Sequence, residues 1–91
     1  MPYIKYERRK DLDIHLESLA QEILNNKETL AGDLNYSISY LLNKFVQDKI
    51  NYSLGNTIIG ALECAKLEFY RRVLAQYEDK KIDENGDVYR I

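Results

Sequence analysis

The sequence predicts an all-α protein, one domain over residues 1–91 with three helices and short extended termini. Three observations predict it. Apolar residues recur at spacings of three and four over three stretches, Gly (four) and Pro (one) are scarce, and two turn-rich segments, NNKETLAG and NYSLGN, separate the stretches. Because a chain this short leaves much of its surface exposed when it folds alone, we expect a helical-bundle oligomer to complete the core.

The first helix is expected at about residues 7–25. Its apolar stripe consists of Leu12, Leu16, Leu19, Ala20 and Ile23. The segment that follows holds two adjacent asparagines and Gly32, residues that favour a loop over a helix.

The second helix is expected at about residues 33–50. Asp33 is its predicted N-cap, because a carboxylate accepts hydrogen bonds from the unpaired amides of a first turn. One face carries the apolar stripe Leu34, Ile38, Leu41, Leu42 and Phe45. The opposite face carries Tyr36 and Tyr40, one turn apart. This tyrosine face is a candidate binding surface, since tyrosine rings pack against partners while their hydroxyls stay hydrated. Packing on a neighbouring subunit explains the pattern equally well.

The third helix is the longest, at about residues 54–81, and Gly55 is the expected flexible point before it. Its main apolar stripe is Ile58, Leu62, Ala65, Phe69 and Val73. A second stripe consists of Ile59, Leu67, Tyr70, Leu74 and Tyr77. A helix that is apolar on two sides is typical of a central position, so we expect the second stripe to meet another subunit.

Glu63, Lys66 and Tyr70 lie at i, i+3 and i+7 along the second stripe and form a further candidate site. Charges within an apolar stripe are costly unless they are paired or used. One interpretation is a ligand pocket or an acid–base pair at a subunit boundary. The other, which we favour, is an interfacial Glu63–Lys66 ion pair that fixes the register of the helix.

The two ends of the chain carry opposite charge. Residues 5–10 hold four basic side chains and one acidic one, and residues 78–87 hold five acidic side chains and two lysines. The ends can therefore attract each other, within a chain or between subunits. After Lys81 we expect the helix to stop and Asn85-Gly86 to form a turn. The extended termini, residues 2–6 and 87–91, alternate polar and apolar residues, which predicts a small two-stranded patch.

Composition and missing motifs narrow the function further. A single cysteine, Cys64, forms neither an internal disulfide nor a Cys-type zinc site, and its apolar surroundings predict that it is buried. No phosphate-binding glycine motif occurs, and no cofactor is expected. A net charge of −2 is too small for bulk electrostatics to choose a partner. We interpret the basic run at residues 5–10 as a solvated helix start rather than a phosphate-binding segment, so nucleic acid is not an expected partner. The N-terminal residues lack an apolar signal region and no segment reaches membrane-spanning length, so we expect no membrane association and a cytoplasmic location.

One class of enzyme is an alternative. The segment ETLAGDLNYSISYLL is similar to the acidic helix of all-α nucleotide pyrophosphohydrolases, in which two carboxylates one turn apart hold magnesium. Here Glu28 and Asp33 are five residues apart, about 140° around a helix, so the two alone do not share an ion. A metal-dependent enzyme would need carboxylates from several helices, such as Glu28, Asp33 and Glu63. No catalytic residue is identified otherwise.

Four segments that together span nearly the whole chain resemble one family: MPYIK, GDLNY, IIGALECAKLEFYRRV and YEDKKIDENGDVY. It is a family of small uncharacterised helical proteins, a domain of unknown function, from bacteria, archaea and phages. The resemblance implies an intracellular helical protein of this length and no established activity. Proline is common in the family where Gln76 stands here, so the position of Tyr77 on the second stripe depends on this departure.

The leading interpretation is a non-enzymatic binding or interaction module that forms a homo-oligomer. Its partner would be a protein or a small nucleotide-like ligand, bound at the tyrosine face or at Glu63, Lys66 and Tyr70. The phage members of the family suggest a third interpretation, an oligomer that sequesters a small molecule.

Overall fold

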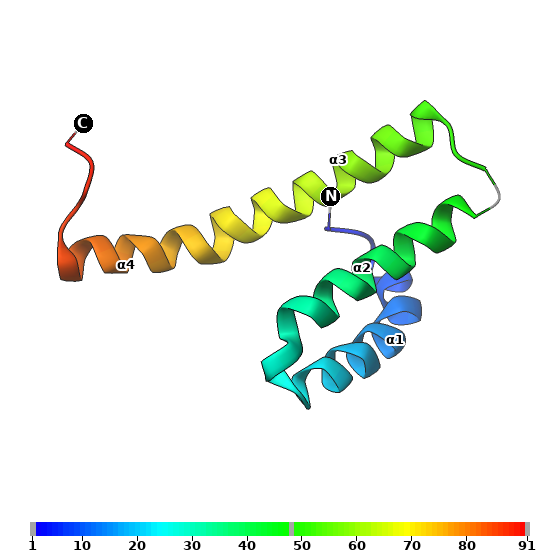
Figure 1. Cartoon of the computed structure of the whole chain (residues 1–91), viewed down its shortest axis with the longest axis horizontal. Coiled ribbons are helices and arrows are strands. Elements are labelled where there is room, and N and C mark those ends of the chain that lie inside the picture. The colour runs from blue at the N-terminus through cyan, green and yellow to red at the C-terminus, as the bar shows by residue number, and fades with distance from the viewer. Residues whose placement is uncertain (1, 48, 91) are drawn as a thin grey trace. The chain divides into compact units, whose positions relative to one another are not determined.

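The computed structural model describes residues 2–47 and 49–90. It confirms the all-α fold with three helices: α1, α2 and a long helix that comprises α3, η2 and α4 (Figure 1). The sequence predicts one domain, and the chain forms two compact units, residues 2–55 and the residues from Asn56 onward. No helix within the described ranges is long and apolar enough to cross a membrane.

The first unit is a helical hairpin. Helix α1 (Tyr6–Leu24) is followed by a single 3₁₀ turn, η1 (Lys27–Thr29), and α2 (Leu30–Val46) begins at once. The predicted stripes face the inside of this hairpin only in part. Half-buried side chains include Leu12, Ile23, Ile38 and Leu42, whereas Leu34 and Phe45 are 53% and 58% exposed.

The start of α2 differs from the prediction. Asp33 is not the N-cap, because the 3₁₀ turn feeds directly into a helix that already includes Gly32. Thr29 occupies the cap position, and its hydroxyl lies 2.8 Å from Asp33 Oδ2, within hydrogen-bonding distance. Asp33 therefore acts from inside the first turn, where its negative charge is favourable at the positive end of the helix dipole.

The long helix runs without a break through α3 (Tyr52–Phe69), the π-helical turn η2 (Tyr70–Leu74) and α4 (Ala75–Asn85). Gly55 is not a flexible point but part of α3, where its amide donates to the Asn51 carbonyl at 2.9 Å. The side chain of Asn51 caps the helix, because its Oδ1 accepts from the Leu54 amide at 2.8 Å.

The end of the long helix also differs from the prediction, which placed it at Lys81. The helix continues to Asn85, since Glu and Lys are good helix formers and Lys81 pairs with Glu84 at 3.3 Å along its surface. The residue that ends it is Gly86, with φ of 90°. The expected turn at Asn85-Gly86 is therefore present, at the end of the helix rather than after a loop.

The termini do not form the expected two-stranded patch. Tyr6 already belongs to α1, and no strand occurs among the described residues. At the other end, the amide of Tyr89 donates to Asp87 Oδ1 at 2.8 Å, which turns the chain instead of extending it. Ile91, the last residue of the predicted C-terminal segment, lies outside the described residues.

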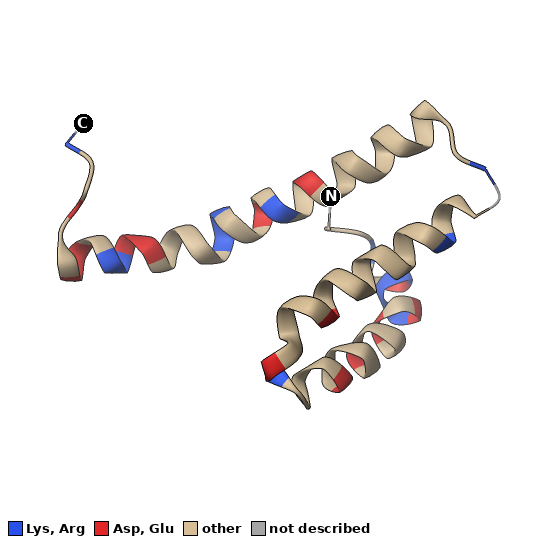
Figure 2. Ribbon diagram, in the orientation of Figure 1, with Lys and Arg blue, Asp and Glu red and all other residues tan. Residues whose placement is uncertain are grey.

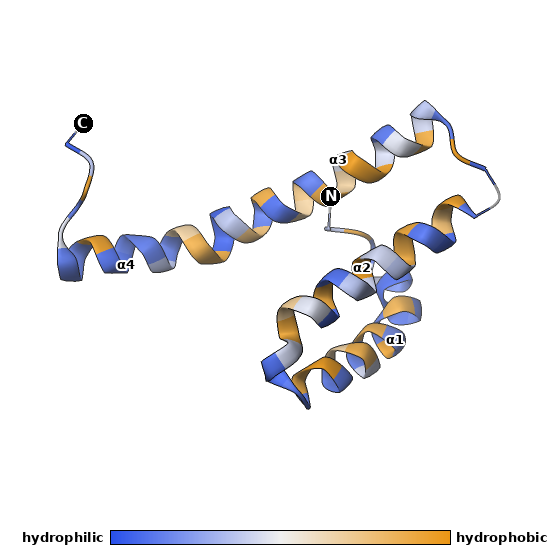
Figure 3. Cartoon of the chain, in the orientation of Figure 1, coloured by the Kyte–Doolittle hydropathy of each residue, from blue (hydrophilic) through white to orange (hydrophobic). Residues whose placement is uncertain are grey.

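Charge and hydropathy are distributed unevenly over the helices. Charged residues cluster on α1 and from Glu63 onward, whereas α2 and the start of α3 carry few (Figure 2). Apolar residues occur along every helix (Figure 3), yet none of the described residues is fully buried. Cys64, predicted to be buried, is exposed, because nothing in its unit covers that side of the helix.

Candidate functional site

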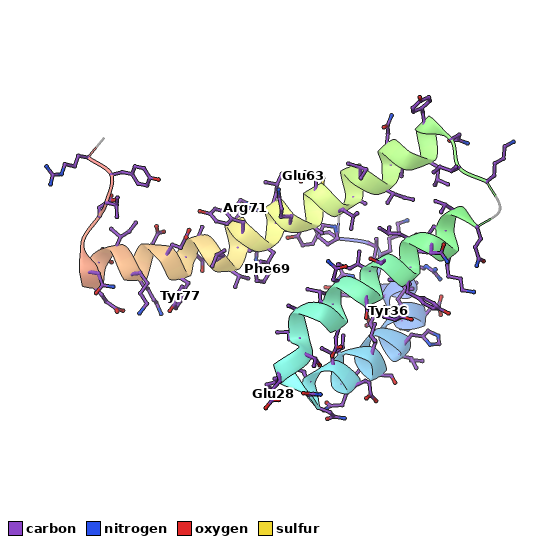
Figure 4. The ribbon with its side chains drawn as sticks, in the orientation of Figure 1. Glu28, Tyr36, Glu63, Phe69, Arg71 and Tyr77 are labelled. Atoms are coloured by element: carbon purple, nitrogen blue, oxygen red, sulfur yellow. The ribbon has the colours of Figure 1, made fainter. Side chains whose placement is uncertain are left out.

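The tyrosine face lies on α2, as its spacing predicts. The rings of Tyr36 and Tyr40 contact each other in a tilted arrangement, with centroids 6.2 Å apart and an interplanar angle of 42°. Lys44 Nζ lies 5.8 Å from the centroid of the Tyr40 ring, within range of a cation–π interaction. A shallow groove of about 280 Å³ runs between these rings and Leu19 of α1. Tyr36, labelled in Figure 4, is 68% exposed.

Glu63 and Lys66 form an ion pair on the surface of α3. The distance from Lys66 Nζ to Glu63 Oε1 is 3.1 Å, and more than half of each side chain is exposed. An exposed i,i+3 pair of this kind contributes little to stability. Tyr70 does not join the two, because its hydroxyl hydrogen-bonds to a different residue, Glu78.

The bond between Tyr70 and Glu78 is possible because of the π-helical turn. The Tyr70 hydroxyl donates to Glu78 Oε1 at 2.7 Å, across eight residues. In a regular α-helix, positions eight apart differ by about 80° around the axis. The π turn, in which the Ala75 amide bonds to the Tyr70 carbonyl, inserts roughly one extra residue into the helix. The two side chains are thereby brought into line along the same side.

The hydrogen bond has an electrostatic consequence for Tyr70. Glu78 raises the pKa of the Tyr70 phenol above its ordinary value, first by accepting its hydrogen bond and then by its negative charge. Ionisation of the phenol would break the bond and place two anions side by side. The interaction with Glu78 therefore favours the neutral, protonated form of the Tyr70 phenol.

An open groove of about 730 Å³ is lined by residues of η2 and α4 and by the C-terminal residues 86–89. Its apolar and aromatic lining includes Leu74, Tyr77, Ile82, Val88 and Tyr89. Three carboxylates also line it: Glu78, Asp79 and Asp87. Its single lysine, Lys81, is engaged with Glu84 and lies 5.5 Å from the centroid of the Tyr77 ring. The groove, which we call the C-terminal groove, therefore combines apolar surface with an excess of negative charge.

Glu78 and the C-terminal groove were not found by sequence reasoning. The sequence predicts that the helix stops at Lys81, whereas the groove is lined in part by Ile82, on the last turn of a helix that continues to Asn85. A π-helical turn has no recognisable signature in a single sequence, so the alignment of Tyr70 with Glu78 was not visible. The one available signal was the spacing of Tyr70, Leu74, Glu78 and Ile82 by four residues.

The carboxylates of the enzyme alternative are divided between the two units. Glu28 lies in η1, and the Asp33 carboxylate is hydrogen-bonded by Thr29. Glu63 lies in the other unit, where it pairs with Lys66. Across residues 2–47 and 49–90, no three Asp, Glu, His or Cys side chains are grouped closely enough to hold a metal ion.

Of the comparisons with known proteins, only the family comparison gives a match. No curated protein and no solved structure matches this chain. A family match covers residues 1–88, nearly the whole sequence, in agreement with the resemblance that the GDLNY and ENGDVY segments indicate. The chain belongs to the family described as Domain of unknown function (DUF6899).

Proposed function

We propose that this protein is a non-enzymatic helical interaction module that acts as a homo-oligomer, and that copies associate through the uncharged parts of α2 and α3. The observation that carries the proposal is the distribution of charge (Figure 2). Residues 34–43 and 50–62 contain no charged side chain, whereas α1 has eight charged residues and α4 has six. A surface helix normally carries charge on its outer side, so long uncharged stretches of helix favour a position inside an assembly.

The exposure of side chains on these stretches supports the same conclusion. Ile59 is 66% exposed, Tyr36 68% and Leu41 45%, although all three are large and uncharged. Apolar surface costs roughly 25 cal/mol for each Å² left in water. Contiguous patches of such side chains are typical of protein–protein interfaces. Tyr36 and Tyr40 lie within the proposed surface, which favours contact with a neighbouring subunit as their role.

In the proposed assembly, the partner of each chain is a second copy of the same chain. A two-helix hairpin and a single long helix each have apolar surface that they cannot cover by themselves. Association of hairpins and helices from several copies yields the helical bundle that these stripes require. The protein would then bind other molecules as an assembled oligomer.

The test compares two substitutions of the same chemistry at similar exposure. Ile59→Lys places a charge in the uncharged stretch of α3, and Ile14→Lys does so on the charged helix α1, where Ile14 is 74% exposed. We expect Ile59→Lys to weaken self-association by roughly 30- to 100-fold, corresponding to about 2–3 kcal/mol for a buried isoleucine replaced by a charge. Ile14→Lys should leave it unchanged.

Sedimentation velocity across a range of protein concentrations measures the effect. A wild-type protein that stays monomeric at every concentration would contradict the proposal. Equal weakening by both substitutions would also contradict it, because the uncharged surface would then have no special part in association.

A further inference from the structure

The carboxylates of the C-terminal groove, like several others on the surface, form no ion pair within the described residues. Asp11, Glu63, Glu68 and Glu84 each form an ion pair with a lysine or arginine. Glu78, Asp79 and Asp87 line the groove and have no basic partner among the described residues. Next to them lies apolar surface, with Val88 85% and Tyr89 74% exposed. The groove therefore suits a segment that carries both positive charge and apolar side chains.

Residues 2–10, which we call the basic turn, have this combination. Lys5, Arg9 and Lys10 form no ion pair with a carboxylate in the part of the chain that the structure describes. Exposed apolar side chains alternate with them: Ile4 is 39% exposed and Tyr6 77%. Arg9 is held in place by its bond to the Ile4 carbonyl at 2.8 Å and by its position over the Tyr6 ring.

Each of the two segments also carries net charge of the same sign as the helix end on which it lies, which is unfavourable. The basic turn lies at the N-terminus of α1, the positive end of the helix dipole, and Lys5 at the cap position gives no side-chain hydrogen bond. The last turn of α4, at the negative end of its dipole, holds Asp83 and Glu84 and only acids in its charged positions. Contact between an electropositive helix start and an electronegative helix end relieves both conflicts.

We propose that the C-terminal groove of one chain binds the basic turn of a second copy. The inference rests on the proposed self-association and adds a second, charged contact to the uncharged one. Lys5 and Lys10 would pair with the carboxylates of Glu78, Asp79 and Asp87, and the apolar side chains of the basic turn would cover Leu74, Ile82 and Val88. Two chains that exchange this contact reciprocally form a closed pair, whereas one-way contact produces a ring or a chain of subunits.

Carbodiimide cross-linking tests the contact directly, since it joins an amine to a carboxylate only when the two already touch. Full-length chains of natural isotopic composition are mixed with chains labelled with heavy nitrogen, unfolded together and refolded. Mass spectrometry then identifies which residues are linked and whether a linked pair comes from two different chains. We expect links from Lys5 or Lys10 to Glu78, Asp79 or Asp87, in mixed-isotope pairs.

Three results would overturn the inference. Links found only within chains of one isotopic kind would mean that the basic turn binds its own chain. An oligomer that forms without these links would leave the proposed function intact and remove the charged contact. A monomer without links would remove both.

A pair of matched variants provides an independent test. Glu78→Gln with Asp79→Asn neutralises the groove, and Glu17→Gln with Glu22→Gln removes the same charge from α1. We expect the first pair to weaken association by about two- to fivefold for each charge at low salt, and much less at high salt, because exposed ion pairs are screened. The α1 pair should leave association unchanged, and equal effects of the two pairs would contradict the inference.

Discussion

At the scale of single residues, the clearest interaction is the hydrogen bond from the Tyr70 hydroxyl to Glu78. Glu78 raises the pKa of the Tyr70 phenol in the folded protein. For a raised pKa, the stabilisation is fully present below the ordinary value near 10.0 and is lost as the pH rises through the raised value. The bond therefore holds at neutral pH and is lost as the phenol ionises in alkali.

Replacing Glu78 tests this interaction. In Glu78→Gln, the phenol of Tyr70 should titrate at lower pH than in the wild type, because the negative charge that opposes its ionisation is gone. Carbon-13 NMR of labelled tyrosine rings follows the titration, and the signal absent from Tyr70→Phe assigns it. Asp79→Asn serves as the control and should shift the pKa less, since Asp79 makes the smallest contribution. An unchanged Tyr70 titration in Glu78→Gln would refute the bond.

At the scale of the helices, the ends are set by backbone chemistry at a few positions. Asn51 starts the long helix by accepting a hydrogen bond, and Gly86 ends it with a positive φ that other residues rarely adopt. The π turn between them is continuous with the helix on both sides. It changes which of the later side chains share a face with Tyr70, so Glu78 lies in line with the Tyr70 hydroxyl.

Replacement of glycine by alanine is expected to have opposite effects on stability at Gly86 and at Gly32. Gly86→Ala should destabilise the protein by about 1 kcal/mol, because a side chain is strained at a φ of 90°. Gly32→Ala should stabilise it by about 0.5–1 kcal/mol, since Gly32 lies in α2 with nothing near the added methyl group. Urea unfolding followed by circular dichroism measures both. Destabilisation by Gly32→Ala would indicate that a neighbouring molecule packs closely against α2.

At the scale of the whole molecule, stability is expected to depend on protein concentration. No described side chain is fully buried within one chain, and in the proposed oligomer association supplies the missing apolar burial. A tenfold higher concentration adds about 1.4 kcal/mol to a dimer, which should raise the thermal midpoint by several degrees. Calorimetry at a series of concentrations checks this. A midpoint that stays constant would show that each chain is stable alone.

The sequence by itself determined the fold class and the positions of three helices, because the spacing of apolar residues depends only on helix geometry. It also located the tyrosine face, since Tyr36 and Tyr40 lie within one regular helix. It misplaced local boundaries at Asp33, Gly55 and Lys81, where several residues compete for the same cap or stop.

Two features are decided only by the tertiary structure, because they depend on irregular helix geometry and on the path of the C-terminal residues. The bond from Tyr70 to Glu78 needs a π turn, and the C-terminal groove needs the helix to end at Gly86 so that residues 87–89 leave its axis. The structure also left Cys64 exposed, against the expectation from its neighbours in sequence. A periodic pattern identifies which face of a helix is apolar, whereas the molecule that covers that face is determined by packing in three dimensions.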